Sequence, residues 1–328
     1  MSDEPKTKFA AVLVAAQEAS DIRRTLATLR RQTIVKEIEL LLVGPNTSIF
    51  DALSAEETAG FGRVETLSWG GPIKNVDASA IVGIRAARSP VLSIVEDHVY
   101  LEPTWVQDIV DVHEQHDNVV GVGCQIVLAN HPTALPIANH LFALASYTAP
   151  LQEGPVERVS RHQVAYKLHW LKSVDEDLES LLPRGGGMVE RAAKEGGLYM
   201  AANVRIHHLA CADWSESLAV RMASGRLNGS TTKNRDGFIA RIKATLRTPQ
   251  IAWWRIRSQV KKYPTLGLRI VTVAMAASLL LTAECLGYLR GIWFGPGQSY
   301  DLICRHEYRR ERGVRPSDTQ RLNTHWKI

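Results

Sequence analysis

The sequence predicts an α/β protein built on a doubly wound, mixed but mainly parallel sheet, with a helical extension towards its C-terminal end. Short apolar runs recur along the first half of the chain, as expected for strands buried on both faces. Segments with apolar residues at helical spacing lie between these runs, and such alternation is typical of parallel sheets. With 328 residues, the chain can hold one large domain and an appendage, or two domains.

The first elements are predicted to be a strand, a helix and a strand. The apolar run 9–16 predicts a buried strand, and Ser20 offers an N-cap for the helix that follows it. Apolar residues recur at helical spacing over 22–29. The run 38–43 returns to strand character before a Gly-Pro pair interrupts it.

Later segments continue the alternation. We expect helices at 78–87, 105–113 and 188–194, and strands at 91–95, 119–128 and 204–208. Ligands of such sheets bind at the carboxyl ends of the strands. A ligand-binding site is therefore expected at the end of the strand 91–95.

Charge divides the chain into two parts. Residues 1–220 hold 19 Lys and Arg against 28 Asp and Glu, whereas residues 221–328 hold 20 against 6. We expect a catalytic domain at 8–213 and a basic helical extension at 214–328. A basic tail on an acidic body indicates an anionic partner for the tail, either nucleic acid or an anionic membrane surface.

The extension is predicted to contain an apolar helix at 266–289. Its uncharged core is short for a membrane span, but aromatic and basic residues flank it, as at a bilayer interface. A buried helix of a soluble bundle or homo-oligomer is the alternative. Nucleic acid is not an expected partner, because the basic residues are interleaved with a long apolar run.

Cysteine usage and the N-terminal residues indicate a cytoplasmic protein. The four cysteines are widely spaced and form no CxxC motif, which argues against a zinc ribbon or a disulfide framework. Residues 1–8 are polar and lack the apolar segment of a secretory signal. We therefore expect a cytoplasmic location, peripheral to or anchored at the inner face of the cell membrane.

Glu96, Asp97 and His98 directly follow the predicted strand 91–95 and form a candidate metal and diphosphate site. Side chains alternate along a strand, so Glu96 and His98 would share one face. Asp97 would point away unless the strand has already ended. A solvated polar turn is the alternative reading.

Several spaced motifs occur in order along residues 8–210. The motifs are Val14-Ala15-Ala16-Gln17-Glu18, Gln32, Gly83-Ile84-Arg85-Ala86-Ala87-Arg88-Ser89, Val95-Glu96-Asp97-His98 with Pro103 and Trp105, His162-Gln163-Val164-Ala165-Tyr166-Lys167, and Val204-Arg205-Ile206-His207-His208-Leu209. Together they resemble the catalytic domain of glycosyltransferase family 2, in the branch whose metal motif is Glu-Asp-His. That family has the GT-A fold, in which a Rossmann-like half that binds the nucleotide sugar joins a half that binds the acceptor.

The resemblance implies a nucleoside diphosphate sugar donor and a divalent cation that neutralises the leaving diphosphate. Carboxylates suit Mg²⁺ or Mn²⁺, and an imidazole shifts the preference towards Mn²⁺. His207 is an alternative to His208, and a structural histidine is the alternative to a ligand. The expected metal residues are Glu96, His98 and His208; the expected nucleotide-binding residues are Gln17, Glu18 and Asp97, with weaker candidates at Lys74, Asn75 and Asp77.

Two departures from the family pattern affect the chemistry. The family places a carboxylate base where this chain has Arg184-Gly185-Gly186-Gly187, and its second strand ends in acidic residues where this one ends Val43-Gly44-Pro45-Asn46. Asp177 is the candidate base, because an inverting transfer needs a carboxylate to take the acceptor proton. The alternative is that Asp177 belongs to the acidic first turn of a helix.

The sequence thus predicts a metal-dependent, hexosyltransferase-like glycosyltransferase that inverts configuration. It would transfer sugar to a glycan or lipid-linked acceptor at the cytoplasmic membrane face. The alternative is a catalytically degenerate GT-A-like protein that acts in binding or assembly within a glycan pathway.

Overall fold

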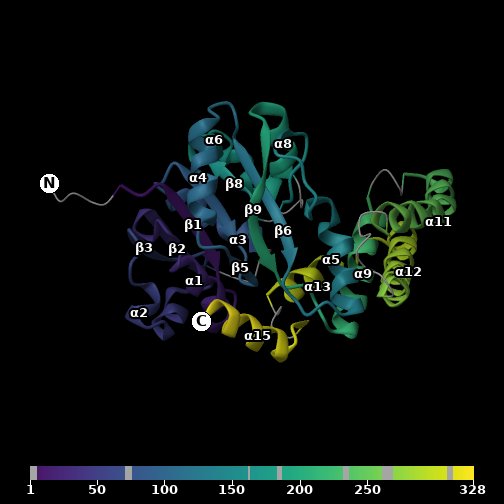
Figure 1. Ribbon diagram of the computed structural model, residues 1–328. Helices are drawn as coiled ribbons and strands as arrows, with labels where there is room; N and C mark the ends of the chain where they lie inside the picture. Colours follow the sequence, from purple (N-terminus) through teal and green to yellow (C-terminus); the bar gives the residue numbers. More distant parts are fainter. Residues whose placement is uncertain are drawn as a thin grey trace. The chain divides into compact units, whose positions relative to one another are not determined.

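The computed structural model describes residues 6–70, 76–161, 163–182, 187–231, 236–260, 269–308 and 313–328. The chain divides into two compact units, shown with their elements in Figure 1. The expected boundary at 213/214 falls inside unit 2, and helix α15 (Pro316–Trp326) crosses from one unit to the other. Unit 1 comprises Met1–Val127, Ser146–His208 and Leu322–Ile328; unit 2 comprises Leu128–Ala145 and Leu209–Arg321.

Unit 1 is built on a mixed sheet, which confirms the predicted α/β class. Within the described residues the sheet has nine strands in the order β3-β2-β1-β4-β8-β6-β9-β5, and β7 pairs with β9. The run from β3 to β4 is parallel, whereas β8 is antiparallel to both its neighbours and β9 is antiparallel to β5 and β7. The strands are β1 Phe9–Val14, β2 Ile38–Gly44, β3 Arg63–Ser68, β4 Val91–Val95, β5 Val99–Leu101, β6 Gly121–Leu128, β7 Gly154–Val156, β8 Ala165–Lys167 and β9 Leu198–His208.

The central strands are buried along their length, as their apolar sequences require. Glu39 is the one charged residue of β2, and its side chain is fully buried. It accepts hydrogen bonds from the backbone amides of Arg88 and Ser89 at 2.9 Å and from the Ser89 hydroxyl at 2.8 Å, and it pairs with Arg63. These partners compensate the cost of burying a charge.

The helices of unit 1 follow the predicted alternation, but the first begins differently. Ser20 is not the N-cap: Glu18 takes that position, because a 3₁₀ turn precedes the α-helix. The elements are η1 Ala19–Ile22, α1 Arg23–Leu29, η2 Val35–Glu37, η3 Thr47–Ala52, α2 Ala55–Thr58, α3 Val76–Ala86, α4 Trp105–Gln115, α6 Leu168–Ser173, η5 Asp175–Asp177, α7 Leu178–Leu181 and α8 Gly187–Glu195; η4 Ala145–Tyr147 lies at the division.

Unit 2 is helical, and its apolar core forms between α5 and α12. Side chains of α5 such as Leu135 and Phe142 pack against Ala276, Leu280 and Leu281 of α12. Figure 1 shows α9, α11 and α12 side by side. The helices are α5 Ala134–Leu144, α9 Trp214–Gly229, α11 Phe238–Val260, α12 Ile270–Phe294 and α13 Ser299–Glu307.

Helices α9 and α12 approach each other through two pairs of glycines. Gly225 and Gly229 of α9 face the backbone of α12, and Gly287 and Gly291 of α12 face the backbone of α9. A Cβ built on Gly287 would lie 2.8 Å from the carbonyl carbon of Met222, inside ordinary contact distance. Small residues spaced four apart on both helices are the pattern that permits such close packing.

The opposite side of α12 leaves apolar side chains exposed. By length and composition, α12 is the one described helix that could cross a membrane, with a mean hydropathy of 1.9 and 39% of its apolar window buried. Val271, Met275, Leu279 and Leu286 are 53–64% exposed. A helix turns about 100° per residue, so these four side chains share one face. The predicted apolar segment 266–289 overlaps α12, and 266–268 lie outside the described residues.

Candidate metal centre

The Glu96-Asp97-His98 segment forms a turn held in place by α1. Strand β4 ends at Val95 and β5 begins at Val99, so the three residues lie between two short strands. The hydroxyl of Thr25, which is fully buried, lies 3.0 Å from the carbonyl oxygens of both Glu96 and Val99. This contact fixes the backbone at both ends of the turn.

Three side chains meet at this turn. The Nε2 atoms of His98 and His208 are 2.9 Å apart, and Glu96 Oε2 lies 3.4 Å from the first and 3.5 Å from the second. Both imidazoles are buried, with 4% and 5% of their surface exposed. In the part of the chain that the structure describes, this is the one group of three side chains whose donor atoms could share a metal ion.

Asp97 orients the imidazole of His98. Its Oδ1 lies 2.6 Å from His98 Nδ1, and an ionised carboxylate can only accept, so Nδ1 carries the proton. The lone pair of His98 is then on Nε2, which faces Glu96 and His208. A carboxylate that holds the second nitrogen of a histidine is the common outer partner of a metal-binding imidazole. Asp97 does not simply point away, because the strand has already ended at Val95.

Strand pairing brings His208 to the turn. Strands β5 and β9 are antiparallel, and their register sets Val99 opposite His208 and Tyr100 opposite His207. Successive side chains alternate, so only one of the two histidines can face Glu96. His207 instead lies 3.3 Å from Glu102 Oε1, and burial lowers its pKa although that carboxylate opposes the shift.

The donor set and its spacing fit a divalent cation. Ligands about 2.1 Å from a metal lie about 3.0–3.4 Å apart in octahedral or tetrahedral geometry, close to the 2.9–3.5 Å observed. Two imidazoles and one carboxylate suit Mn²⁺, Fe²⁺ or Zn²⁺ better than Mg²⁺, which prefers oxygen ligands. Glu96, His98 and His208 are the residues that would hold the ion.

Gln17 and Glu18 follow the carboxyl end of β1, the strand next to β4. The β1–β4 register pairs Leu13 with Val95, so the residues after both strands emerge at one sheet edge. Both side chains are exposed; Glu18 caps η1 and accepts a hydrogen bond from Ser20 Oγ at 3.1 Å. Burial raises the pKa of Asp21, and the charges of Asp97 and Glu18 add to the shift. The edge therefore concentrates negative charge.

The remaining candidates are not joined to the cluster by a described contact. Asp177, at the end of η5, lies 3.6 Å from the guanidinium of Arg191. Lys74 and Asn75 lie outside the described residues, as does the side chain of Asp77.

Two buried polar residues hold the backbone around the turn and around the segment after β5, and their contacts could not be predicted from the sequence. Gln32, part of a family motif, is buried: its amide donates to Glu102 O at 2.8 Å and its oxygen accepts from Val106 N at 2.9 Å. Thr25 gave no signal, since a threonine in a helix is unremarkable. Only the contacts of its hydroxyl reveal its role.

A second support lies on the outer side of β5. The ring of Trp326 stacks on Tyr100 with centroids 6.0 Å apart and meets His207 edge-on at 5.4 Å. The Tyr100 hydroxyl donates to Asn323 Oδ1 at 3.0 Å. The last residues of the chain thereby brace the strand pair that carries His208.

No family model and no curated protein matches this chain. Among solved structures, the chain is similar to residues 1–349 of S. aureus TarS in complex with UDP, at 12% identity and a TM-score of 0.49. It is also similar to a structure of S. aureus TarS 1–349 at 14% identity and a TM-score of 0.48. Each match covers 94% of this chain and 93% of the other. Both TM-scores lie below 0.5, a level at which similarity does not assign a function.

Proposed function

We propose that this chain is a manganese-dependent glycosyltransferase with a GT-A fold. It transfers a hexose from a nucleoside diphosphate donor to a glycan or lipid-linked acceptor at the cytoplasmic face of a membrane. The observation that carries the proposal is the cluster of Glu96, His98 and His208 at the carboxyl end of β4. This end of a parallel sheet is where α/β proteins bind their ligands.

Each residue in and around the turn has a distinct part in the proposed reaction. Glu96, His98 and His208 hold the cation, which when bound supplies positive charge to a leaving diphosphate. Asp97 keeps the His98 lone pair on Nε2. Thr25 keeps the turn in position, so the ligands need no rearrangement. Gln17 and Glu18, at the same sheet edge, contact the nucleotide.

Two contacts bear on the choice between an enzyme and a binding protein. Asp177, the proposed base of an inverting transfer, lies 3.6 Å from Arg191, and the neighbouring Asp175 accepts from Arg85 Nε at 2.9 Å. Acids engaged in this way favour the alternative of a degenerate GT-A-like binding protein. The metal cluster favours the enzyme, because two imidazoles buried beside a carboxylate suit a bound cation that the proposed reaction needs.

The membrane part of the proposal is supported by α12. Its exposed apolar face would be costly in water and favourable in a bilayer interface. Exposed Lys243 and Arg247 of the neighbouring α11 supply charges that suit anionic lipid headgroups.

Calorimetry on the full chain tests the metal and nucleotide sites. Mn²⁺ is titrated first, and UDP or GDP is then titrated into the Mn²⁺-loaded protein. We expect the Glu96→Ala, His98→Ala double variant to abolish both binding steps. His208→Ala should weaken Mn²⁺ binding strongly, whereas His207→Ala, its matched neighbour, should change it little. Asp97→Asn should weaken binding by about 10- to 100-fold, as for other outer partners of metal ligands.

Metal-independent nucleotide binding, or equal loss in the His207 and His208 variants, would contradict the proposed site. Hydrolysis of nucleotide sugars is then measured with the wild-type chain and with Asp177→Asn. Nucleotide binding without turnover of any donor would favour the binding protein. Turnover that Asp177→Asn leaves intact would exclude Asp177 as the base.

A further inference from the structure

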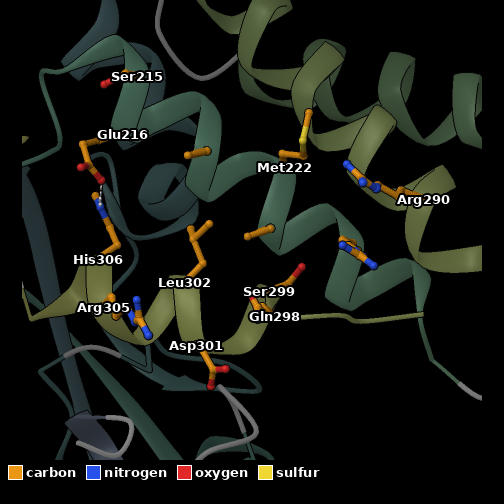
Figure 2. A pocket seen from close by; sticks show the side chains of 13 residues that line it. Ser215, Glu216, Met222, Arg290, Gln298, Ser299, Asp301, Leu302, Arg305 and His306 are labelled. Carbon is orange, nitrogen blue, oxygen red and sulfur yellow. Dashed lines mark hydrogen bonds and ion pairs between the residues drawn. The ribbon is translucent and has the colours of Figure 1, made fainter. Parts of the chain in front are cut away.

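Unit 2 contains a cavity that the proposed reaction does not use. It has a volume of about 700 Å³ and lies between α9, the C-terminal part of α12 and α13 (Figure 2). All of its lining residues belong to unit 2. Its chemistry can therefore be considered apart from the metal cluster.

Three arginines line the cavity: Arg226 of α9, Arg290 of α12 and Arg305 of α13. Arg226 is fixed, because its Nε donates to the carbonyl oxygen of Gly295 at 2.7 Å and its guanidinium packs against Gly297. Arg290 and Arg305 are exposed, and neither pairs with an acidic side chain of the described residues. Guanidinium groups that line one cavity suit an anion with several oxygens. Figure 2 shows Arg290 near Met222 and Arg305 near His306, at opposite ends of the lining.

The two acidic lining residues do not cancel this charge. Glu216 lies 3.1 Å from Nδ1 of His306, and Figure 2 shows the two side chains pointing toward each other. Asp301 points away from α9 in the same view. The first residues of α13, with Ser299 at its N-terminal end, also line the cavity and add the positive end of a helix dipole.

The cavity also has an apolar part. Met222 and Leu302 line it and are 36% and 40% exposed. Arg290 lies between Leu286 and Trp293 on one face of α12, since residues spaced by three or four share a face. Arg290 therefore adjoins the exposed apolar face of α12. A free inorganic anion would not use this surface, whereas a phosphate with an attached hydrocarbon chain would.

We infer that this cavity binds the phosphate group of a lipid phosphate, a phosphomonoester or diphosphate on a hydrocarbon chain. The phosphate or diphosphate binds among the arginines that line the cavity, and the chain extends along Met222 and Leu302 towards the apolar side of α12 next to Arg290. The inference rests on the membrane part of the proposed function and is independent of the metal and the nucleotide. It assigns unit 2 the task of holding a lipid-borne phosphate.

Sedimentation with vesicles tests the inference on the full chain in EDTA, without nucleotide. One set of phosphatidylcholine vesicles contains phosphatidic acid, a phosphomonoester; a second contains phosphatidylserine adjusted to equal surface charge. The variant Arg290→Lys, Arg305→Lys keeps the net charge but loses the bidentate geometry. The variant Arg290→Ala, Arg305→Ala also removes the charge. Both positions are exposed, so circular dichroism should show a native fold for each.

We expect wild type to bind phosphatidic acid vesicles more tightly than phosphatidylserine vesicles. In both arginine variants the ratio of the two affinities should fall by about tenfold. The matched control Lys243→Ala, Arg247→Ala removes two exposed basic residues of unit 2 that do not line the cavity. It should weaken binding to both vesicle types by the same factor. If the arginine variants lost binding to both vesicle types by the same factor, the binding would depend on diffuse surface charge, and the inference would be overturned.

Inorganic pyrophosphate provides the second arm. We expect millimolar pyrophosphate to compete only weakly, because it lacks the hydrocarbon chain. Full release of the protein from phosphatidic acid vesicles by pyrophosphate would assign the cavity to a soluble anion. A failure of the metal-binding experiment would leave these outcomes unchanged, because no metal is present.

Discussion

Replacing Gly287 by Ala tests whether backbone contact between α9 and α12 holds unit 2 together. Two effects of the change have opposite signs. Alanine is the better helix former, so propensity alone would stabilise α12 by about 1 kcal/mol. The added Cβ, however, would clash first with the carbonyl oxygen of Met222, and it would also lie 2.8 Å from the carbonyl carbon of Met222 and 3.0 Å from the amide nitrogen of Arg226.

The steric effect should prevail. Ordinary van der Waals contact begins near 3.4 Å, so the carbonyl carbon alone would require α9 and α12 to separate by about 0.6 Å, and the nearer carbonyl oxygen requires more. A gap of this size forfeits about a quarter to a half of each dispersion contact across an interface. Added methyl groups in close-packed sites cost about 1–3 kcal/mol, and the two-sided backbone contact here places Gly287→Ala at the upper end. After the propensity gain, we expect a net destabilisation of about 1–2 kcal/mol.

Hydrogen exchange measured by mass spectrometry is the appropriate assay, because a chain with two units need not unfold in one step. Peptides from α9 and α12 should exchange about 5- to 30-fold faster in Gly287→Ala, which corresponds to 1–2 kcal/mol. Thr282→Ala, at an exposed position of the same helix, is the matched control and should leave exchange almost unchanged. Unchanged or slower exchange in Gly287→Ala would refute the packing argument.

Two further predictions concern unit 1. Burial holds the pKa of His113 near 4, below its usual 6.5, while its Nε2–H donates to Ala165 O at 3.1 Å. The unfolded chain therefore binds the extra proton between pH 6.5 and 4, and stability falls as the pH is lowered through this window. In urea unfolding, the free energy of unfolding of wild type should fall by about 3 kcal/mol more between pH 6.5 and 4 than that of His113→Gln, which keeps a donor but does not titrate. Parallel pH profiles of the two proteins would contradict this. Trp326→Ala removes the stacking on Tyr100, so it should cost about 1 kcal/mol and weaken Mn²⁺ binding several-fold. Calorimetry that finds equal affinity in Trp326→Ala and in the exposed Lys327→Ala would disprove a bracing role.

The central part of the fold could be predicted from local pattern. Strands β1, β2 and β4 are largely apolar on both faces, so their sequences alone identify buried parallel strands. Strands β5, β7 and β8 have only three residues each, too few to show a period of two. Helix α5 was not predicted because nearly all its residues are buried, Asn139 and His140 included, so its sequence lacks a clear amphipathic period.

The packing of unit 2 has a signal in the sequence, the spacing of its glycines. Gly225 and Gly229, like Gly287 and Gly291, are spaced four apart on helices. That spacing permits close approach, but it does not identify the partner helix. Only the structure shows that the glycine pair of each helix faces the backbone of the other helix.

The sequence by itself determined the α/β class and the acid, acid and imidazole at the end of β4, because burial and side-chain chemistry are local properties. It also determined the charge contrast between the two parts of the chain. The tertiary structure decided which histidine completes the cluster. That choice depends on the register of β9 against β5, where a shift by one residue would turn His207 inward and His208 outward. The structure likewise decided that Asp97 supports His98, since the strand ends one residue before the motif begins.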